Sequence, residues 1–273
     1  MQPDATSAVD TIATEVFAAL GGTRQIAPFS SRPRGLALDD AYRVTAALET
    51  KRKARGETAV GRKIGFTNRT IWAEYGVNAP NWGYITDRSV RALSTASTLP
   101  LAPFAEPRIE PEILFALARA PAPDMDERAL SGCIDWIAHG YEIVQSIFPQ
   151  WKFALADTVA CNGMHGALLI GPRHPFAPRA EEWRHELANF DIALYRNGAL
   201  ADRGHAANVL GSPLTALRHL VGLLAADSVN PPLAAGEIVS TGTLTRALPV
   251  APGETWHTEL SGIPLDGIRL AFA

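Results

Sequence analysis

The chain has 273 residues, a hydrophobic fraction of 47% and a charged fraction of 19%, which are ordinary values for a packed globular protein. A formal net charge of -3 lacks the basic surplus expected of proteins that bind nucleic acid or anionic membranes. The two cysteines, Cys133 and Cys161, cannot build a disulfide framework, and we expect buried thiols in a reducing compartment.

The N-terminal sequence is not typical of a secretory signal. Asp4, Asp10 and Glu15 interrupt it, and no basic start precedes an apolar run. We find no apolar stretch that approaches the ~18 residues suggestive of a membrane span. The sequence therefore predicts a cytoplasmic protein that binds neither membranes nor nucleic acid.

The opening part of the chain is predicted to be helical, and we assign residues 1–60 to a helical N-terminal region. Residues 4–20 are rich in alanine and contain few helix breakers. A second helix is expected to begin with Asp39 as its N-cap and to stop at Gly56. Apolar residues recur between these two points at helical spacing.

Residues 61–273 form the second predicted unit, a β-rich domain. One clear helix is expected late in it, with Ser212 as the N-cap and Pro213 in the first turn. Strands followed by turns and a single late helix favour an α+β architecture around a curved or rolled sheet. The predicted strands are short apolar runs bounded by turn-forming residues, namely GRKIGFT, IEPEILFAL, YEIVQSI, GALLIG, FDIALYRNG, GEIVSTGTLT and GIRLAFA.

Glu110 and Glu112 are expected to share one face of the strand IEPEILFAL, because side chains alternate along a strand. Two like charges on an apolar strand are unfavourable unless they are solvated or bridged by a cation. For this pair alone, a solvated outer face is the simpler interpretation. Glu142, in the strand-like run HGYEIV, adds a third carboxylate among apolar neighbours. Three carboxylates on neighbouring strands suit Mg²⁺ or Mn²⁺.

Lys63 in GRKIGFT is a candidate acid/base group. Burial would lower the pKa of its amine and let it exchange protons near neutral pH, whereas an ordinary surface lysine is the alternative. A nucleotide-binding P-loop is excluded, because Ile64 stands where that motif requires Ser or Thr after the lysine. HExxH, GxSxG and GxGxxG motifs do not occur in the sequence.

Together these segments resemble the 2-keto-4-pentenoate hydratase and 4-oxalocrotonate decarboxylase group of the fumarylacetoacetase-like superfamily. The resemblance implies a mainly helical N-terminal part, a β-rich domain with a rolled mixed sheet, and a role in the breakdown of aromatic compounds. It also implies a homo-oligomer, with a paralogous subunit as an alternative partner. The matching segments run from DDAYRVTAAL through GRKIGFT, IEPEILFAL, YEIVQSIF, KFALADTVACN and GHAANVLGSPLTAL to LAAGEIVSTGTLTRALPVAPGE.

The resemblance also implies roles for individual residues. Glu110, Glu112 and Glu142 match the ligands of a divalent metal, Mg²⁺ or Mn²⁺, and Lys63 matches a general acid/base. The residues expected to bind substrate are Arg62, Thr67, Asp157, Asn162 and Thr241.

Two positions depart from the group's pattern. Asn81 stands where the group usually carries an acid, and Cys161 replaces a second acid. We expect Asn81 to take part in catalysis, but an amide can only orient water or a carbonyl group and cannot titrate.

The implied reaction is the addition of water to a 2-hydroxy-2,4-dienoate, which gives a 4-hydroxy-2-oxo acid. Decarboxylation or tautomerisation of a 2-oxo-3-enedioate relies on the same enolate chemistry and stays open as an alternative. A non-catalytic subunit beside an active paralogue also stays open, although three retained glutamates and Lys63 argue against it. Hydrolytic carbon–carbon cleavage is disfavoured, because the superfamily's hydrolases carry a histidine-bearing lid helix and no His-Glu element occurs between Gly65 and Gly83.

Overall fold

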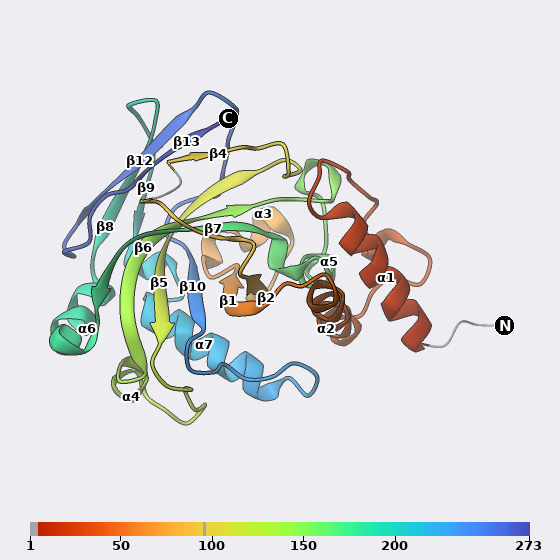
Figure 1. Ribbon diagram of the computed structural model, residues 1–273, viewed down its shortest axis with the longest axis horizontal. Coiled ribbons are helices and arrows are strands. Elements are labelled where there is room, and N and C mark those ends of the chain that lie inside the picture. Colours follow the sequence, from red (N-terminus) through yellow and green to blue (C-terminus); the bar gives the residue numbers. More distant parts are fainter. Residues whose placement is uncertain (1–4, 95–96) are drawn as a thin grey trace.

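A computed structural model describes residues 5–94 and 97–273, and it places two β-sheets beside a group of N-terminal helices (Figure 1). In the described chain the larger sheet has eight strands in the order β2-β1-β10-β5-β6-β7-β3, with β11 paired to β5. These strands are β1 (Ala59–Gly65), β2 (Asn81–Thr86), β3 (Val90–Ala92), β5 (Arg108–Leu117), β6 (Ile134–Val144), β7 (His165–Pro175), β10 (Ile238–Thr243) and β11 (Leu248–Pro249).

The smaller sheet has five strands in the described chain, in the order β4-β13-β12-β8-β9. They are β4 (Thr98–Leu99), β8 (Asp191–Arg196), β9 (Ala199–His205), β12 (Thr255–Ser261) and β13 (Arg269–Phe272). The α-helices are α1 (Ala5–Ala19), α2 (Leu38–Ala54), α3 (Trp72–Tyr75), α4 (Glu127–Ser131), α5 (Leu155–Ala160), α6 (Ala180–Ala188) and α7 (Pro213–Ala226).

The larger sheet is mixed and curls around its own inner face, which confirms the predicted architecture (Figure 1). Most neighbouring strands run antiparallel, but β1 pairs with β10 and β3 pairs with β7 in parallel. The long β5–β6 pair lies in the middle of this sheet and supplies the residues of the site described below.

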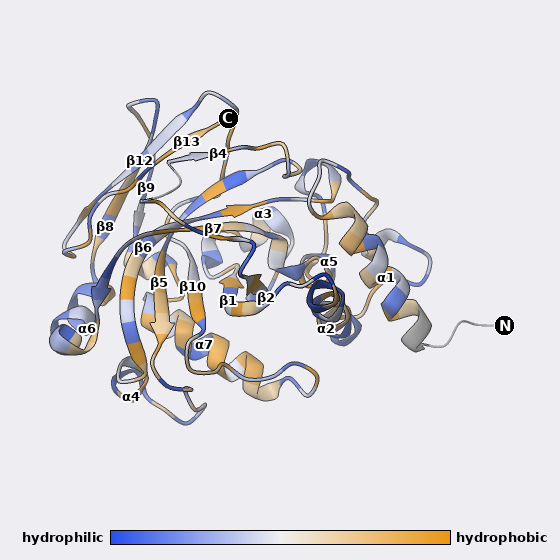
Figure 2. Ribbon diagram, in the orientation of Figure 1, coloured by the Kyte–Doolittle hydropathy of each residue, from blue (hydrophilic) through white to orange (hydrophobic). Residues whose placement is uncertain are grey.

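The described residues form four hydrophobic clusters, and the three largest hold these layers together. Helix α7 packs its apolar side chains, among them Leu217 and Leu220, against one face of the larger sheet, and Figure 2 shows its apolar colouring. A second cluster joins the two sheets, with Tyr141 and Trp256 among its members. A third joins α1 and α2 to residues 147–164. The N-terminal helices therefore share a hydrophobic core with later segments of the chain. The domain boundary expected at residue 60 stays a prediction.

The predicted helices largely agree with the structure. Helix α1 covers the described part of the predicted helix at 4–20, and Ser212 caps α7 by accepting a hydrogen bond from the Thr215 amide. The N-cap prediction for the second helix is wrong: Ala37 is the N-cap, and Asp39 lies in the first turn. There its negative charge still suits the helix dipole.

The prediction of a single late helix is also wrong, because α6 adds a second one at Ala180–Ala188. This helix buries only Trp183 and Leu187, and its other residues are mostly charged or small. Two apolar positions one turn apart give too weak a periodic signal to identify a helix from sequence.

The segment Ala206–Ala226, which includes α7, is long and apolar enough by composition to cross a membrane, and 50% of its most apolar window is buried. The expectation that no such stretch exists is therefore wrong by this criterion. The apolar residues of α7 pack in the protein core, which accounts for the composition without a membrane.

Candidate functional site

The three predicted glutamates come together on one face of the larger sheet. Strands β5 and β6 are antiparallel, and Glu110 lies directly opposite Glu142 in their register. Residues opposite each other in an antiparallel pair project to the same face, and Glu112 follows two positions along. One carboxylate oxygen from each residue lies within 4.8 Å of the other two. The convergence expected from sequence is confirmed.

The surroundings of each carboxylate differ. Glu112 is fully buried, and its Oε2 accepts hydrogen bonds from the Ser240 hydroxyl and the Gly242 amide. Glu142 is also fully buried; its Oε1 lies 2.8 Å from Nδ1 of His165, and its Oε2 lies 3.3 Å from Nζ of Lys63. These contacts fix both side chains in place.

Burial and mutual repulsion change the acidity of the cluster. Burial raises the pKa of Glu110 to about 7 and raises that of Glu112 well above its usual value. Burial also acts to raise the pKa of Glu142, but Lys63 and His165 outweigh it and leave that pKa below its usual value. Three carboxylates this close cannot all ionise freely without a compensating positive charge.

The donor set fits a divalent cation. Oε1 of Glu112 is buried without a hydrogen-bond partner in the described structure, which is costly for a carboxylate oxygen, and Oε2 of Glu142 has only its ion pair with Lys63. Carboxylate oxygens are the ligands that hard ions such as Mg²⁺ and Mn²⁺ prefer. Glu110, Glu112 and Glu142 are therefore suited to hold one such ion together.

Lys63 projects from β1 toward this cluster, and only 3% of its side chain is exposed. Burial alone lowers the pKa of its amine, as the sequence suggested. The negative charges of Glu142, Glu110 and Glu112 outweigh burial, so the pKa lies above its usual value. The expectation of a lowered pKa for Lys63 is therefore wrong, because it did not include the negative charge of the three glutamates.

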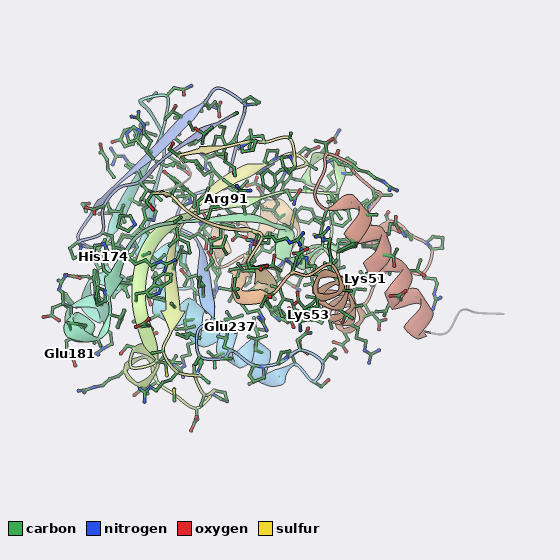
Figure 3. The ribbon with its side chains drawn as sticks, in the orientation of Figure 1. Lys51, Lys53, Arg91, His174, Glu181 and Glu237 are labelled. Carbon is green, nitrogen blue, oxygen red and sulfur yellow. The ribbon has the colours of Figure 1, made fainter. Side chains whose placement is uncertain are left out.

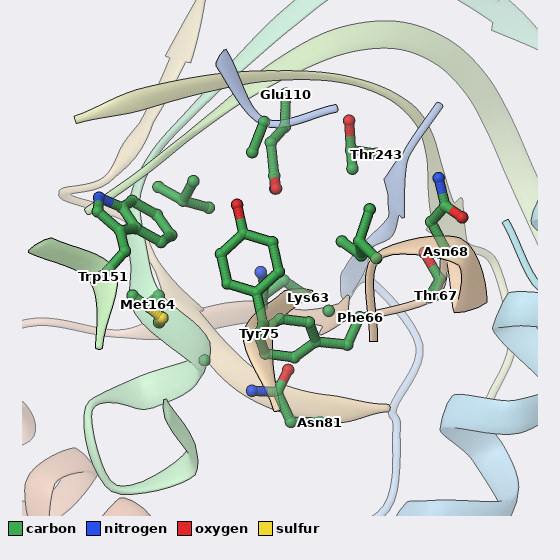
Figure 4. A pocket seen from close by; sticks show the side chains of 15 residues that line it. Lys63, Phe66, Thr67, Asn68, Tyr75, Asn81, Glu110, Trp151, Met164 and Thr243 are labelled. Carbon is green, nitrogen blue, oxygen red and sulfur yellow. The ribbon is translucent and has the colours of Figure 1, made fainter. Parts of the chain in front are cut away.

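A small cavity of about 40 Å³ opens beside Lys63 and Glu110. Figure 4 shows Glu110 entering it from one side and Lys63 and Asn81 from the other. Aromatic and aliphatic side chains make up much of the remaining wall. The lining residues are Lys63, Gly65, Phe66, Thr67, Asn68, Ile71, Tyr75, Asn81, Glu110, Val144, Trp151, Gly163, Met164, Thr243 and Ala247.

Unusual backbone conformations gather around this cavity. Phe66, Trp151 and Met164 line it with positive φ angles of 54°, 58° and 64°. Such angles are uncommon for residues with a side chain, and they tend to cluster at functional sites. Gly163 has a φ of 62°, and a Cβ there would lie 2.9 Å from Cδ of Lys63. The turn from Asn162 to Met164 therefore closes tightly over the lysine.

Asn81 lies within the cavity wall, as its predicted catalytic role requires. Its Nδ2 donates a hydrogen bond of 2.8 Å to the Thr158 hydroxyl, while its Oδ1 is buried without a partner in the described structure. Gly65 leaves the necessary space, since a Cβ at that position would meet Oδ1 of Asn81 at 2.6 Å and Nζ of Lys63 at 3.1 Å. The free amide oxygen is available to accept a hydrogen bond from water or substrate.

Thr67 also lines the cavity, and its buried hydroxyl has no partner in the described structure. Its role in substrate binding stays a prediction.

Arg62 lies outside the cavity lining, and its role in substrate binding stays a prediction. Alternation along β1 sends it to the face opposite Lys63. There its guanidinium pairs with Glu237 at 2.8 Å and lies 3.9 Å from the ring centroid of Tyr84. Figure 3 labels Glu237 at the start of β10.

Asp157, Asn162 and Thr241 also lie outside the cavity lining and bond to the backbone around it, and their roles in substrate binding stay predictions. Asp157 accepts hydrogen bonds from the amides of Ser30 and Ala154, so it caps α5. The Asn162 side chain bonds to the backbone N–H and C=O of Tyr84 at 2.7 and 2.8 Å. The Thr241 hydroxyl donates to the backbone oxygen of Ile113.

Sequence reasoning missed several residues around the cavity. Tyr75 and Trp151 lie on very short helical segments that carry no periodic signal. Thr243 lines the cavity in place of Thr241, because β10 is irregular between Ser240 and Thr243. Such a bulge shifts which side chains face the site, and alternation alone cannot reveal it.

Arg108 lies near the outer side of the cavity, next to two of its aromatic residues. Its Nη1 donates a hydrogen bond of 2.6 Å to the Tyr75 hydroxyl, and its guanidinium lies 4.1 Å from the Trp151 ring centroid. Arg108, unlike Arg62, therefore contacts residues that line the cavity.

The described residues include two buried, free cysteines, Cys133 and Cys161, as expected. Burial raises the pKa of the Cys161 thiol to about 12. This residue is therefore a neutral core group and not a replacement for an acid.

Residues 73–266 match the family described as fumarylacetoacetate (FAA) hydrolase C-terminal. The chain is 29% identical over 262 residues to a 2-hydroxyhexa-2,4-dienoate hydratase of Comamonas testosteroni, covering 96% of this chain and 97% of the relative. It is 29% identical over 256 residues to a 2-keto-4-pentenoate hydratase of Paraburkholderia xenovorans strain LB400, covering 92% and 90%.

A solved structure has the same fold. It is a 4-oxalocrotonate decarboxylase from Pseudomonas putida G7 in complex with magnesium and adipate, with a TM-score of 0.88. The two chains are 24% identical, and the match covers 98% of each.

Proposed function

Because the chain belongs to the fumarylacetoacetate hydrolase C-terminal family, we propose that it is a divalent-metal-dependent hydratase of a 2-hydroxy-2,4-dienoate. The product of water addition is a 4-hydroxy-2-oxo acid. Support comes from two relatives named as hydratases that match over nearly the whole chain. The observation that carries the proposal is the arrangement of three carboxylates opposite a buried lysine in a largely apolar pocket.

Glu110, Glu112 and Glu142 are the residues that would hold Mg²⁺ or Mn²⁺. A bound cation of this kind supplies Lewis-acid stabilisation of negative charge on the 2-oxygen and carboxylate of the substrate. The solved decarboxylase that shares this fold was obtained with magnesium, which supports the choice of ion.

Lys63 is the proton donor and acceptor in this proposal. In the metal-free protein the three carboxylates hold the pKa of its amine above the usual value, so the lysine carries a proton there. Nζ gives a proton to the terminal carbon while the 2-hydroxyl releases its own proton to solvent, and the dienol becomes a conjugated 2-oxo acid. Addition of water at C4 and of a proton at C3 then completes the product, and the lysine regains its proton from solvent. A positioned acid/base group of this kind contributes ~10²–10⁴-fold in rate.

Asn81 and Thr67 are proposed to orient the water and the substrate. Each presents a buried oxygen without a protein partner in the described structure, and both oxygens belong to residues that line the pocket. The amide of Asn81 does not titrate, so the proton transfer falls to Lys63.

The pocket wall favours a monocarboxylate over a dicarboxylate. Lys63 is the only cationic side chain among its described lining residues, and Phe66, Trp151 and Met164 form an apolar wall. A second carboxylate buried against that wall would have no partner and would lose its solvation. Hydration of a dienoate with an apolar distal end is therefore the preferred reaction.

Arg108 favours the alternative reaction, decarboxylation of a 2-oxo-3-enedioate. Its guanidinium lies just outside the pocket, bonded to the Tyr75 hydroxyl. Movement of the tyrosine would expose this cation to a distal carboxylate, and arginine is well suited to bind one. Loss of carbon dioxide leaves the same dienolate, so both reactions draw on the same metal and lysine.

One assay separates these reactions. The protein is incubated with 2-hydroxypenta-2,4-dienoate and, separately, with a 2-oxo-3-enedioate, each with and without Mg²⁺, and with Glu110→Gln as the inactive control. Magnesium-dependent loss of ultraviolet absorbance from the dienoate, without carbon dioxide release, is the expected result. Carbon dioxide release from the enedioate alone would favour the decarboxylase. The absence of both reactions would contradict an enzymatic role.

The protein is further proposed to act in the cytoplasm as a homo-oligomer.

A further inference from the structure

A second cavity, separate from the pocket described above, has a strongly basic lining. Its volume is about 210 Å³, and it lies between the ends of α1 and α2 on one side and β2, β3 and the start of β7 on the other. Four arginines line it, Arg52, Arg55, Arg88 and Arg91, together with one carboxylate, Glu57. The cavity therefore has an excess of positive charge.

Arg52 is the most informative of these residues. It lies in the last turn of α2 and is only 8% exposed. Its guanidinium makes no hydrogen bond or ion pair with another side chain in the described chain, although it borders the cavity. Buried charges in proteins are normally paired, because removing them from water is costly. A buried arginine without a protein partner indicates that an anion belongs in the space it faces.

Two nearby carboxylates, Glu57 and Glu49, favour the charged form of Arg52 through space, but neither forms an ion pair with it in the described chain. Both oxygens of Glu57 are engaged, one by Nε of Arg55 at 2.7 Å and the other by the Thr86 hydroxyl at 2.9 Å. Glu49 lies outside the cavity lining, and the closest cation to it is Nζ of Lys53 at 3.9 Å. Burial raises the pKa of Glu49 above its usual value.

The other arginines differ in how firmly they are held. Arg55 is fixed by Glu57 and by the ring of Phe17, whose centroid is 4.4 Å from its guanidinium carbon. Arg88 donates a hydrogen bond to the backbone oxygen of Arg55. Arg91, labelled in Figure 3, is exposed on β3 and has no ion pair in the described chain. Buried and exposed cations thus line the same cavity.

We propose that this cavity is a binding site for a small, multiply charged oxyanion, with phosphate as its simplest representative. Arg52 would contact the anion from the buried side of the cavity, and Arg88 and Arg91 would contact it from the solvent side. Arginine binds such groups in a planar, forked geometry with two parallel hydrogen bonds. The ligand would be a free ion or the phosphate or carboxylate groups of a small metabolite.

The basic cavity adjoins the cluster formed by Glu110, Glu112 and Glu142. His165 lines the cavity, and its Nδ1 lies 2.8 Å from Oε1 of Glu142. Lys63 contacts the other oxygen of the same carboxylate. The bound oxyanion would therefore lie behind Glu142, on the side away from the substrate pocket.

Calorimetric titration with inorganic phosphate and, separately, with succinate, in metal-free buffer, tests the proposal. We expect saturable binding of at least one of them. Arg52→Gln should weaken it at least tenfold, and Arg91→Gln should weaken it several-fold. Arg91 is exposed, so that variant is expected to fold even if Arg52→Gln does not. Arg43→Gln, an exposed arginine on the same helix α2, is the matched control and should bind as the unaltered protein does.

Two results would overturn the proposal. One is the absence of saturable binding for both anions. The other is binding that survives both Arg52→Gln and Arg91→Gln but disappears in Glu110→Gln, which would place the anion in the metal pocket. Retention of phosphate binding by Glu110→Gln also separates this inference from the proposed reaction, which that variant would abolish.

Discussion

Lys63 illustrates how neighbouring charges decide the state of a buried group. Burial favours the neutral amine, whereas three carboxylates favour the ammonium, and the carboxylates prevail. A lysine that keeps its proton in an apolar surrounding is a suitable acid toward a developing carbanion. The sequence placed Lys63 in the site correctly but could not give the sign of its pKa shift, which depends on residues far along the chain.

Replacement of Lys63 tests its role as proton donor. We expect Lys63→Ala to lower turnover by ~10²–10⁴-fold, the usual size of a general acid/base contribution. Binding of Mg²⁺ should persist, because all three glutamates remain. Steady-state kinetics and calorimetry on the same preparation measure both effects. Lys152→Ala, at an exposed lysine, is the control. Full activity in Lys63→Ala would remove this residue from the mechanism.

Proton competition at Glu110 predicts a pH-dependent metal affinity. The pKa of Glu110 is about 7 in the metal-free protein, so an ion must displace a proton below that pH. Apparent affinity for Mg²⁺ should therefore rise with pH, by about tenfold per pH unit for each proton that the ion displaces. Calorimetry between pH 5.5 and 8.5, values chosen to span roughly this pKa, follows the trend. An affinity that is constant over this range would contradict the assignment.

At the scale of elements, the β5–β6 register is what assembles the cluster. Alternation along each strand predicted that Glu110 and Glu112 share a face, and this was confirmed. The pairing of Glu110 with Glu142 was not predictable from either strand alone, because register depends on contacts between distant segments. The resemblance to a family supplied that link before the structure did.

Short and irregular elements limited what the sequence could reveal about the site. The turn from Asn162 to Met164 has successive positive φ angles and no periodic pattern. The bulge in β10 replaced Thr241 with Thr243 at the pocket. Arg62, next to Lys63 in the chain, could have been placed outside the cavity lining by applying strand alternation to β1.

The tight turn at Gly163 predicts a positional effect on Lys63. Gly163→Ala adds a Cβ within 2.9 Å of the lysine side chain and strains a φ of 62°, so Nζ should be displaced. We expect turnover to fall at least tenfold while Mg²⁺ affinity stays the same, since ~1 Å misplacements have large effects on rate. Gly253→Ala, at a φ of 84° with open space around it, controls for backbone strain alone. Equal activity in both variants would show that the turn does not position Lys63.

At the scale of the whole molecule, the two sheets and α7 form a frame that keeps the charged cluster away from water. Tyr141 and Ile143 alternate with Glu142 on β6 and pack toward the second sheet, so the same strand serves the core and the site. The sequence predicted this class of fold, because two of its signals are local. They are the alternation of side chains along each strand and the Ser212 N-cap of α7. The division between the N-terminal helices and the β-rich domain was harder to predict, because hydrophobic packing between distant segments leaves no local pattern in the sequence.

His139, buried between the two sheets, predicts a loss of stability in acid. Its Nδ1 donates to the backbone oxygen of Glu112, its Nε2 lies 2.9 Å from the Thr258 hydroxyl, and burial lowers its pKa from 6.5 to about 4. The unfolded chain therefore binds the proton more tightly, so folding is weakened as pH falls from 6.5 toward 4. The full shift corresponds to ~3 kcal/mol.

Urea unfolding at pH 7 and pH 5, roughly either side of the unfolded pKa, measures this effect. The unaltered protein should lose about 2 kcal/mol from this group between the two values, and His139→Gln should lose correspondingly less. His185→Gln, at an exposed histidine, should behave as the unaltered protein does. Identical pH dependence in all three proteins would contradict a neutral buried His139.

The central claim is that Glu110, Glu112 and Glu142 hold one divalent ion between them. Calorimetric titration with Mn²⁺ or Mg²⁺ tests it most directly, on the unaltered protein and on Glu110→Gln, Glu142→Gln and the exposed control Glu182→Gln. The account predicts one ion per chain, with affinity reduced at least tenfold in the first two variants and unchanged in the control. Equal affinity in all four proteins would show that the ion, and with it the proposed chemistry, does not depend on this cluster.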